Sequence, residues 1–283
     1  MLPKVDTRIP SEVEKQVHAI FLRLFPEGER AFVPRAFDWV GQCFLGRYAD
    51  YQAIDARYHD FEHTLQGTLC LALLLAGRHA AKAQPEIPRN LAELCLFAIL
   101  FHDTGYLKKR GDNEGTGAKY TATHVDRSAA FAREFLMAKG YSEEDAKVVD
   151  NMIHCTGVAV KLEAIPFRND LERTLGYALG TADLLGQMAA HDYVDKLPVL
   201  FLEFAEAALH DAVRGARFAL YKDAADLMRK TPFFWSDYVW PRINEDFGRL
   251  YVYLNEPYPD GPNPYLLAVE KNMQRIQERL KSM

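Results

Sequence analysis

Apolar residues recur three and four positions apart along most of this chain, which is the spacing of one helix face. Over residues 11–25 this spacing predicts an amphipathic helix, with Ser11 as its N-cap. A second helix is expected over about 30–46. Residues 60–82 are apolar nearly all round, so they predict a central helix, and Asp60 is expected to cap it.

Capping residues and glycines divide the next part of the chain into further helices. Asn90 is expected to open a helix that runs to Gly105, where the glycine ends it. Thr123 and Ser142 each stand three positions before an aspartate, a pattern that resembles a capping box. They predict two more helices, and Gly140 is expected to end the first of them.

The helical pattern continues to the C-terminal part. Asn169 or Asp170 is expected to cap a helix with an apolar stripe. One helix is predicted over about 199–216 and a shorter one over about 219–229. After the turn sequence EPYPDGPNP, a last helix is expected to end at Leu280.

These elements predict an all-α fold, since no segment shows the alternation typical of a strand. We expect helices at 1–54 that pack on the core, a functional core at 55–190, and a helical extension of the same domain at 191–283.

Composition narrows the class of protein. A chain of 283 residues with 49% hydrophobic content can bury a large core. Its longest apolar runs fall well short of the roughly 20 residues that span a bilayer, and its N-terminus does not resemble a signal peptide, so we expect a cytoplasmic protein without a membrane partner. Its four cysteines stand far apart and are expected to pack in the core. A net charge of −5 argues against nucleic acid as a partner.

The segment FAILFHDTG, residues 97–105, is the first sign of chemistry. It places Asp103 at the end of an apolar run, where a buried carboxylate costs several kcal/mol unless it is paired or bound to a metal. Asp183 lies on the apolar stripe of its own predicted helix and needs a partner for the same reason. His63 stands near the start of the central helix, and His102 directly precedes Asp103.

Histidine and aspartate side chains together suit divalent metal ions, either one ion or two, with Fe, Mn, Mg, Ni and Zn as candidates. We interpret six side chains as ligands of one metal centre: His63, His102, Asp103, His124, His154 and Asp183. A carboxylate between two ions also fixes a hydroxide that attacks phosphorus. His59, one helical turn before His63, is placed to protonate the leaving group.

The polar segment LKKRGDNEGTGAKYT, residues 107–121, has no helical spacing and is rich in positive charge, which suits phosphate oxygens. Its basic residues are Lys108, Lys109, Arg110 and Lys119. Gln187, one turn after Asp183, is expected to meet the substrate or a bound water. The alternatives are a solvated loop and a surface glutamine. The expected substrate is small and phosphorylated, with nucleotides and cyclic nucleotides as candidates.

The order of His63, His102-Asp103 and Asp183 resembles the H…HD…D signature of the HD-domain superfamily of metal-dependent phosphohydrolases, over roughly residues 55–190. The resemblance implies an all-helical HD-domain bundle in which these four residues bind the first ion. His124 and His154 fall where two-metal members, including the HD-GYP cyclic dinucleotide phosphodiesterases, place histidines for a second ion. Asp103 then bridges the two ions.

The segment YHDFEHT is similar to the YHNxxHA motif of cyclic nucleotide phosphodiesterases, which implies that His59 is the general acid and His63 a ligand. Asp60 and Thr64 depart from that motif. The segment HDTGY lacks the later histidine of the phosphodiesterase HDxxH element, and it has Tyr106 where HD-GYP proteins carry a lysine. The specific substrate of neither group carries over.

The sequence therefore favours a metal-dependent hydrolase of phosphate esters, either a phosphodiesterase or a nucleotide phosphohydrolase. A di-iron oxygenase is an alternative, because HD-superfamily oxygenases such as the inositol oxygenases use the same H…HD…H…H…D set. A regulator that binds nucleotides without cleaving them is another. A homodimer is left open as the assembly state.

Overall fold

The computed structural model describes residues 4–211 and 213–282, and in these ranges the chain forms ten α-helices and no strand. The predicted all-α class is confirmed. The helices are α1 (Pro10–Leu24), α2 (Phe32–Phe44), α3 (Phe61–Ala80), α4 (Arg89–Phe101), α5 (His124–Ala138), α6 (Glu143–Ile153), α7 (Asp170–Met188), α8 (Tyr193–His210), α9 (Ala224–Phe234) and α10 (Pro264–Lys281).

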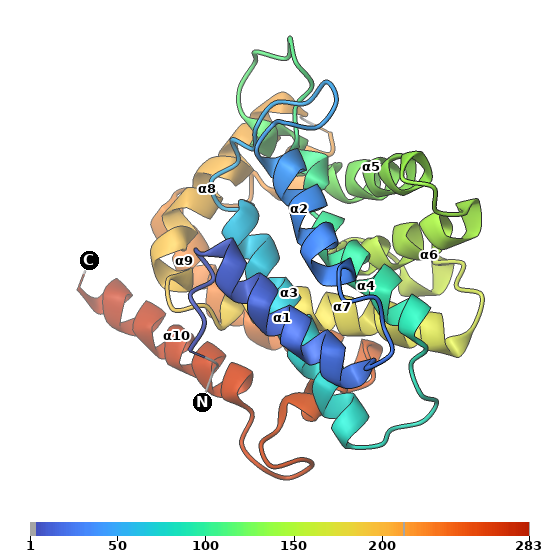
Figure 1. Ribbon diagram of the computed structural model, residues 1–283. Coiled ribbons are helices and arrows are strands. Elements are labelled where there is room, and N and C mark those ends of the chain that lie inside the picture. Colours follow the sequence, from blue (N-terminus) through green and yellow to red (C-terminus); the bar gives the residue numbers. More distant parts are fainter. Residues whose placement is uncertain (1–3, 212, 283) are drawn as a thin grey trace.

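The centre of the molecule is the crossing of α3 with α7 (Figure 1). The two backbones approach closely at Gly67 and Gly186, where a Cβ on Gly186 would lie only 2.8 Å from the Gln66 backbone. Gly67 is one turn from His63 on α3, and Gly186 is three residues from Asp183 on α7. The glycine contact therefore brings His63 and Asp183 to the same level of the bundle.

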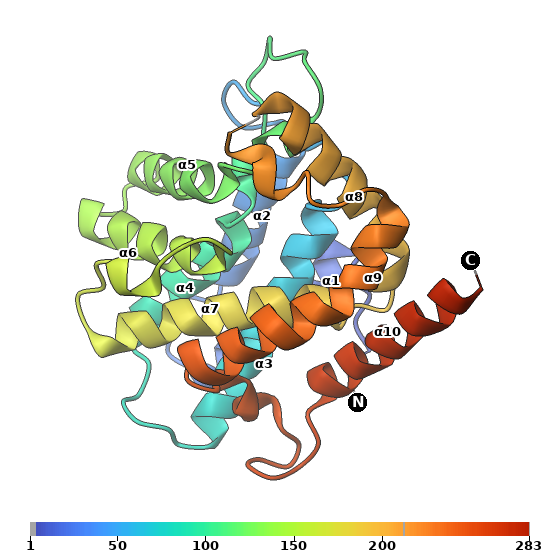
Figure 2. The ribbon, with the colours of Figure 1, turned by 180° about the vertical axis from the view of Figure 1, so that it is seen from behind.

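The other helices surround this crossing on three sides. The N-terminal α1 and α2 pack against α3 and α4 (Figure 1). Seen from behind, α7 crosses the middle of the molecule, with α5 and α6 on one side and α8 and α9 on the other (Figure 2). The last helix, α10, packs on α7, α8 and α9. No helix in the described part of the chain is long and apolar enough to span a membrane.

Several predicted caps are confirmed. The Asp60 carboxylate accepts a hydrogen bond from the His63 backbone N–H at 2.9 Å, and α3 starts directly after it. Ser142 caps α6 through the Asp145 N–H, and Asn169 caps α7. Lys139 is the C-cap of α5, and Gly140 follows it with a φ of +88°, a conformation that glycine adopts without strain.

Two other predicted caps are wrong, and a third is right in its position but lacks the side-chain hydrogen bond. Ser11 does not cap α1, because the helix already begins at Pro10, whose fixed φ suits the first helical position. Asn90 is likewise not the cap of α4, because the helix begins at Arg89 and Pro88, in extended conformation, is its N-cap. Thr123 is the N-cap of α5 but makes no side-chain cap, since its hydroxyl donates to the Tyr120 carbonyl at 3.3 Å.

The predicted boundaries of the later helices also need correction. The first of them, α8, begins at Tyr193 instead of residue 199, and Pro198 lies inside it. The next, α9, begins at Ala224 instead of residue 219, because Asp223 accepts from the Asp226 N–H at 2.7 Å. Short helical turns follow it over residues 235–254, and the last helix starts at Pro264 as the turn sequence predicted.

The core is continuous through all these layers. Its members include all four cysteines, Cys43, Cys70, Cys95 and Cys155, which are free thiols and fully buried. Burial raises the pKa of Cys43 to about 12, so this thiol stays protonated at neutral pH. The expectation that the cysteines pack in the core is confirmed.

Candidate metal centre

Four side chains converge where α3, α4 and α7 meet: His63, His102, Asp103 and Asp183. Their atoms form a closed set, which we call the His/Asp cluster. The His63 Nε2 lies 3.2 Å from Asp103 Oδ2 and 3.3 Å from Asp183 Oδ1. The His102 Nε2 lies 3.3 Å and 3.4 Å from the same two oxygens.

The cluster is cut off from solvent. His102 and Asp103 are each 1% exposed, and His63 is 3% exposed. The His102 Nδ1 donates to the Ile99 carbonyl at 2.7 Å, so a neutral His102 points the lone pair of Nε2 at the two carboxylates. Among the described residues, neither His102 Nε2 nor Asp103 Oδ2 finds a hydrogen-bond partner. Buried acceptors that face one another in this way need a positive charge between them.

Electrostatics give the same picture. Burial raises the pKa of Asp103, but His102 and His63 outweigh burial and hold this pKa well below its usual range. Burial lowers the pKa of His63, but Asp103 and Asp183 outweigh burial and raise this pKa to about 10. Within the described ranges no lysine or arginine pairs with either aspartate. The two negative charges therefore draw either protons or a cation into the cluster.

The donor set and its spacing fit a divalent metal ion. Ligand atoms about 2.0–2.2 Å from an ion lie roughly 3.0–3.5 Å from one another, which matches the four distances in the cluster. Among the described residues, His63, His102 and Asp103 form a buried group whose ligand atoms all lie within 4.8 Å of one another. The Nδ1 bond of His102 to a backbone carbonyl is the outer-sphere contact that metal-binding histidines usually make.

His124 lies next to the cluster and faces Oδ1 of Asp103, whereas His63 and His102 contact Oδ2 of this carboxylate. Its Nε2 is 3.8 Å from Asp103 Oδ1, while its Nδ1 donates to the Thr121 carbonyl at 2.7 Å. Burial lowers the pKa of His124 to about 4, so the ring is neutral at pH 7 and its Nε2 lone pair faces a carboxylate. The two oxygens of Asp103 thus point at different histidines, an arrangement suited to bridging two ions.

Gly105 makes this proximity of Asp103 and His124 possible. The sequence predicted that Gly105 ends a helix, but α4 already ends at Phe101, and Gly105 lies in the short turn Thr104–Tyr106. A Cβ at Gly105 would lie 2.0 Å from the His124 carbonyl oxygen, closer than any side chain permits. The Gly105 N–H also donates to Ser128 Oγ at 2.8 Å, which ties the turn to α5.

The structure places His154 against other acids. Its Nε2 lies 3.4 Å from Asp126 Oδ1, and its Nδ1 lies 2.8 Å from the Asp150 carbonyl. The Asp150 side chain, 3.1 Å away, raises the pKa of His154. The side chain of His154 is 28% exposed, in contrast to the buried cluster. Its assignment as a second-ion ligand stays a prediction.

The residue that sequence reasoning missed is Glu203, on α8. Its Oε2 lies 2.6 Å from the His59 Nδ1, and its Oε1 accepts from the backbone N–H groups of Arg57 and Tyr58 at 2.7 Å each. Burial raises the pKa of Glu203, but His59 and these N–H groups outweigh burial and hold the pKa below its usual value. Nothing in the local sequence marks this glutamate, because its partners lie far away along the chain.

Tyr106 packs against two of the histidines. Its ring stacks on His59 at 4.5 Å and on His124 at 4.7 Å, with interplanar angles of 13° and 22°. The side chain is fully buried, and its hydroxyl makes no hydrogen bond to the described residues. Tyr106 therefore packs on both rings beside the cluster, whose His63 ring is 5.4 Å from the ring of His59.

Two of the four basic residues of the 107–121 loop pair with acids of the same protein. Lys108 is buried, lies 2.8 Å from Asp55 and donates to the Gly115 carbonyl at 2.7 Å. Lys119 pairs with Asp112. The exposed pair differs, since Lys109 lies over the Tyr51 ring and Arg110 donates weakly to a backbone carbonyl at 3.4 Å. Two of the four predicted phosphate ligands are thus neutralised internally.

Gln187 turns inward and contacts the cluster. Its Nε2 lies 3.4 Å from Asp183 Oδ1, and its Oε1 accepts from the Tyr58 hydroxyl at 3.0 Å. A small cavity next to His63 is lined by Gln187, Tyr58 and Gln66. The Gln66 amide nitrogen is buried there without a hydrogen-bond partner in the described ranges. Gln187 therefore orients Asp183 and borders this small cavity.

Fold and site together define an all-α protein with a buried histidine and aspartate cluster at its centre. Residues 110–255 match the profile of the Npun_R2479-like family, and this match spans just over half of the 283 residues. The chain belongs to the Npun_R2479-like family. The matched region includes Asp183 and Glu203, whereas His63 and His102 precede it. No curated protein matches the chain.

Proposed function

We propose that the protein is a metal-dependent hydrolase of phosphate esters, either a phosphodiesterase or a nucleotide phosphohydrolase. One observation carries the proposal: the buried His102 Nε2 and Asp103 Oδ2 lack hydrogen-bond partners in the described part of the chain and converge with His63 and Asp183 at ligand spacing. The resemblance of the same four residues to the HD-domain signature supports it further.

His63, His102, Asp103 and Asp183 would hold the first ion. A second ion would be held by Asp103 Oδ1 and His124, which face each other beside the first site. His154 is the third ligand expected for this ion. Divalent ions bound there supply Lewis acidity toward phosphoryl oxygens and activate water at neutral pH. Gln187 and Ile99 orient the side chains that would bind them.

The proton for the leaving group comes from His59 in this proposal. Glu203 accepts from its Nδ1, which leaves Nε2 as the atom that exchanges a proton. Because Glu203 is itself fixed by two backbone N–H groups, the imidazole has one preferred orientation. Tyr106 stacking adds to that restraint. The pair of His59 and Glu203 is the arrangement expected of a general acid and the group that positions it.

The same ligand types serve di-iron oxygenases, and a nucleotide-binding regulator needs no turnover at all. The His59–Glu203 pair favours hydrolysis over both, because ester cleavage requires a proton donor beside the metals. Turnover of a phosphodiester under anaerobic conditions with manganese or magnesium distinguishes hydrolysis. Consumption of oxygen with a mixed-valent iron signal would identify the oxygenase, and tight binding of an uncleaved nucleotide would identify the regulator.

Elemental analysis of the purified protein, combined with assays on cyclic nucleotides, nucleotides and model mono- and diesters, tests the proposal. We expect a bound transition metal in the wild-type protein and its loss, together with activity, in His102→Ala. His191→Ala is the matched control, since His191 is exposed and lies outside the cluster. A protein that binds no divalent metal, or full activity in His102→Ala, would contradict the proposed function.

A further inference from the structure

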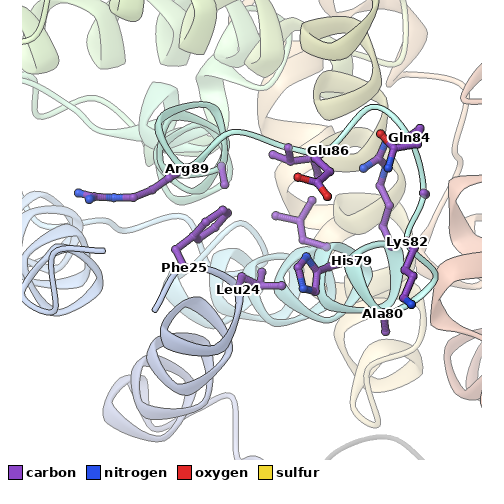
Figure 3. A pocket seen from close by; sticks show the side chains of 13 residues that line it. Leu24, Phe25, His79, Ala80, Lys82, Gln84, Glu86 and Arg89 are labelled. Carbon is purple, nitrogen blue, oxygen red and sulfur yellow. The ribbon is translucent and has the colours of Figure 1, made fainter. Parts of the chain in front are cut away.

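A second cavity, of about 640 Å³, lies at the C-terminal end of α3 (Figure 3). The His/Asp cluster lies at the other end of this helix, where His63 is in the first turn. The cavity is bordered by the end of α1, the C-terminal turn of α3 and the loop that leads into α4. From His63 to His79, α3 rises roughly 24 Å, so this cavity is separate from the metal centre. Its volume is in the range of small-molecule sites, which are roughly 300–1,000 Å³.

One wall of the cavity is apolar. Leu24 and Phe25 at the end of α1 face Leu75 on α3, and Ile87 and Ala92 continue the wall toward α4. Phe25 is held by its neighbour Phe21, at a ring distance of 6.0 Å. Such a wall suits an aromatic ring or an alkyl chain.

The other wall carries a buried positive charge. Arg78 lines the cavity and is only 5% exposed. Its Nη2 donates to the Pro85 carbonyl at 2.8 Å, but among the described residues no carboxylate lies within 4.0 Å of the guanidinium. A buried charge without a counter-ion is costly, so Arg78 is prepared for an anion that arrives from outside.

The other charged side chains around the cavity nearly balance one another. Lys82 adds an exposed positive charge, and Glu86 adds a negative one. Arg89 pairs with Glu93 at 2.7 Å and extends away from the cavity (Figure 3). The last carbonyls of α3 are bonded by the N–H groups of Lys82 and Ala83, which weakens their repulsion of an anion.

We propose that this cavity binds a small organic anion, whose phosphate, phosphonate or carboxylate group meets Arg78 and Lys82. The aromatic or alkyl body of the ligand packs on Leu24, Phe25 and Leu75. Because the cavity shares no lining residue with the His/Asp cluster, this binding does not depend on the proposed hydrolase activity.

Titration calorimetry of the full-length protein with phenylphosphonate, which cannot be hydrolysed as an ester, tests the site. We expect saturable binding, at least about tenfold weaker binding of inorganic phosphate because the apolar body is missing, and no binding of the neutral benzyl alcohol. Octylphosphonate in a parallel titration distinguishes an alkyl body from an aromatic one.

Three exposed positions locate the binding without risk to the fold. Lys82→Gln should weaken phenylphosphonate binding by about three- to tenfold, and Glu86→Gln should strengthen it by a similar factor. Lys271→Gln, an exposed lysine on α10, is the matched control and should leave the affinity unchanged. Arg78→Gln should cost more than Lys82→Gln, with thermal unfolding as a check of its fold.

Two results would overturn the proposal. One is the absence of saturable binding of both phosphonates. The other is an affinity that is the same in Lys82→Gln, Glu86→Gln and the wild-type protein, because binding would then occur elsewhere, the metal centre included.

Discussion

Glu203 Oε2 lies 2.6 Å from His59 Nδ1, although 144 residues separate the two along the chain. The glutamate is 4% exposed and holds the imidazole next to the His/Asp cluster. This contact makes α8, in the C-terminal part of the chain, a contributor to the candidate site. It also gives the proposed general acid a fixed orientation.

The first prediction concerns this pair. Glu203→Gln and His59→Ala should each lower turnover on an alkyl phosphodiester by about 10²–10⁴-fold, because the leaving alkoxide needs a proton. Both should have much smaller effects on a nitrophenyl ester, whose leaving group departs without one. Turnover of the two substrates, with Glu270→Gln on α10 as the control, checks this. Equal losses on both esters would remove the acid role from His59.

The second prediction concerns metal and stability. A divalent ion that binds only the native protein should raise the free energy of unfolding by about 2.7 kcal/mol when its free concentration is about 100 times its dissociation constant. The physical reason is that the ion neutralises the buried Asp103 and Asp183. Thermal unfolding with Mn²⁺ and then with a chelator measures the shift. Asp183→Asn should reduce the shift, and His191→Ala should retain it. If neither the metal nor the chelator changes the melting temperature, the cluster is protonated and binds no metal.

The third prediction concerns Gly105. Gly105→Ala should force the turn away from the His124 carbonyl, since its Cβ would otherwise lie 2.0 Å from that oxygen. We expect a loss of about 1–3 kcal/mol in unfolding free energy, together with weaker metal binding through the displaced Asp103 and His124. Gly41→Ala in α2 is the control, because a Cβ there meets nothing within 4 Å. That substitution should be neutral or stabilising by about 0.4–1 kcal/mol. Denaturant unfolding measures the unfolding free energy of both variants. Equal values would show that the Thr104–Tyr106 turn accommodates the added methyl group at no cost.

The fourth prediction separates two adjacent lysines. Lys108→Ala should lower the unfolding free energy by about 1–3 kcal/mol, because it leaves the Gly115 carbonyl and Asp55 without their buried partner. Lys109→Ala should stay within about 0.5 kcal/mol of the wild type, since its side chain is exposed. Chemical denaturation measures both. Similar losses in the two variants would mean that the ion pair of Lys108 adds nothing to stability.

The sequence by itself determined the helical class and the residue types of the candidate centre. Helix periodicity and caps such as Asp60 depend on residues within about four positions of one another, so they can be predicted without any tertiary information. The same holds for aspartates in apolar stripes, which is why Asp103 and Asp183 stood out. Two helix starts were placed one position too late, because Pro10 itself begins α1, where its fixed φ suits the first helical position, and α4 begins at Arg89 directly after Pro88.

Only the tertiary structure decided which side chains meet. Whether α3, α4 and α7 bring His63, His102, Asp103 and Asp183 within 3.4 Å depends on how the helices pack, for instance at Gly67 and Gly186. Packing also paired His59 with Glu203, Lys108 with Asp55, and His154 with Asp126. These partners lie too far apart along the chain for any local pattern to indicate them, because side-chain pairing across helices is set by long-range contacts that periodicity does not encode.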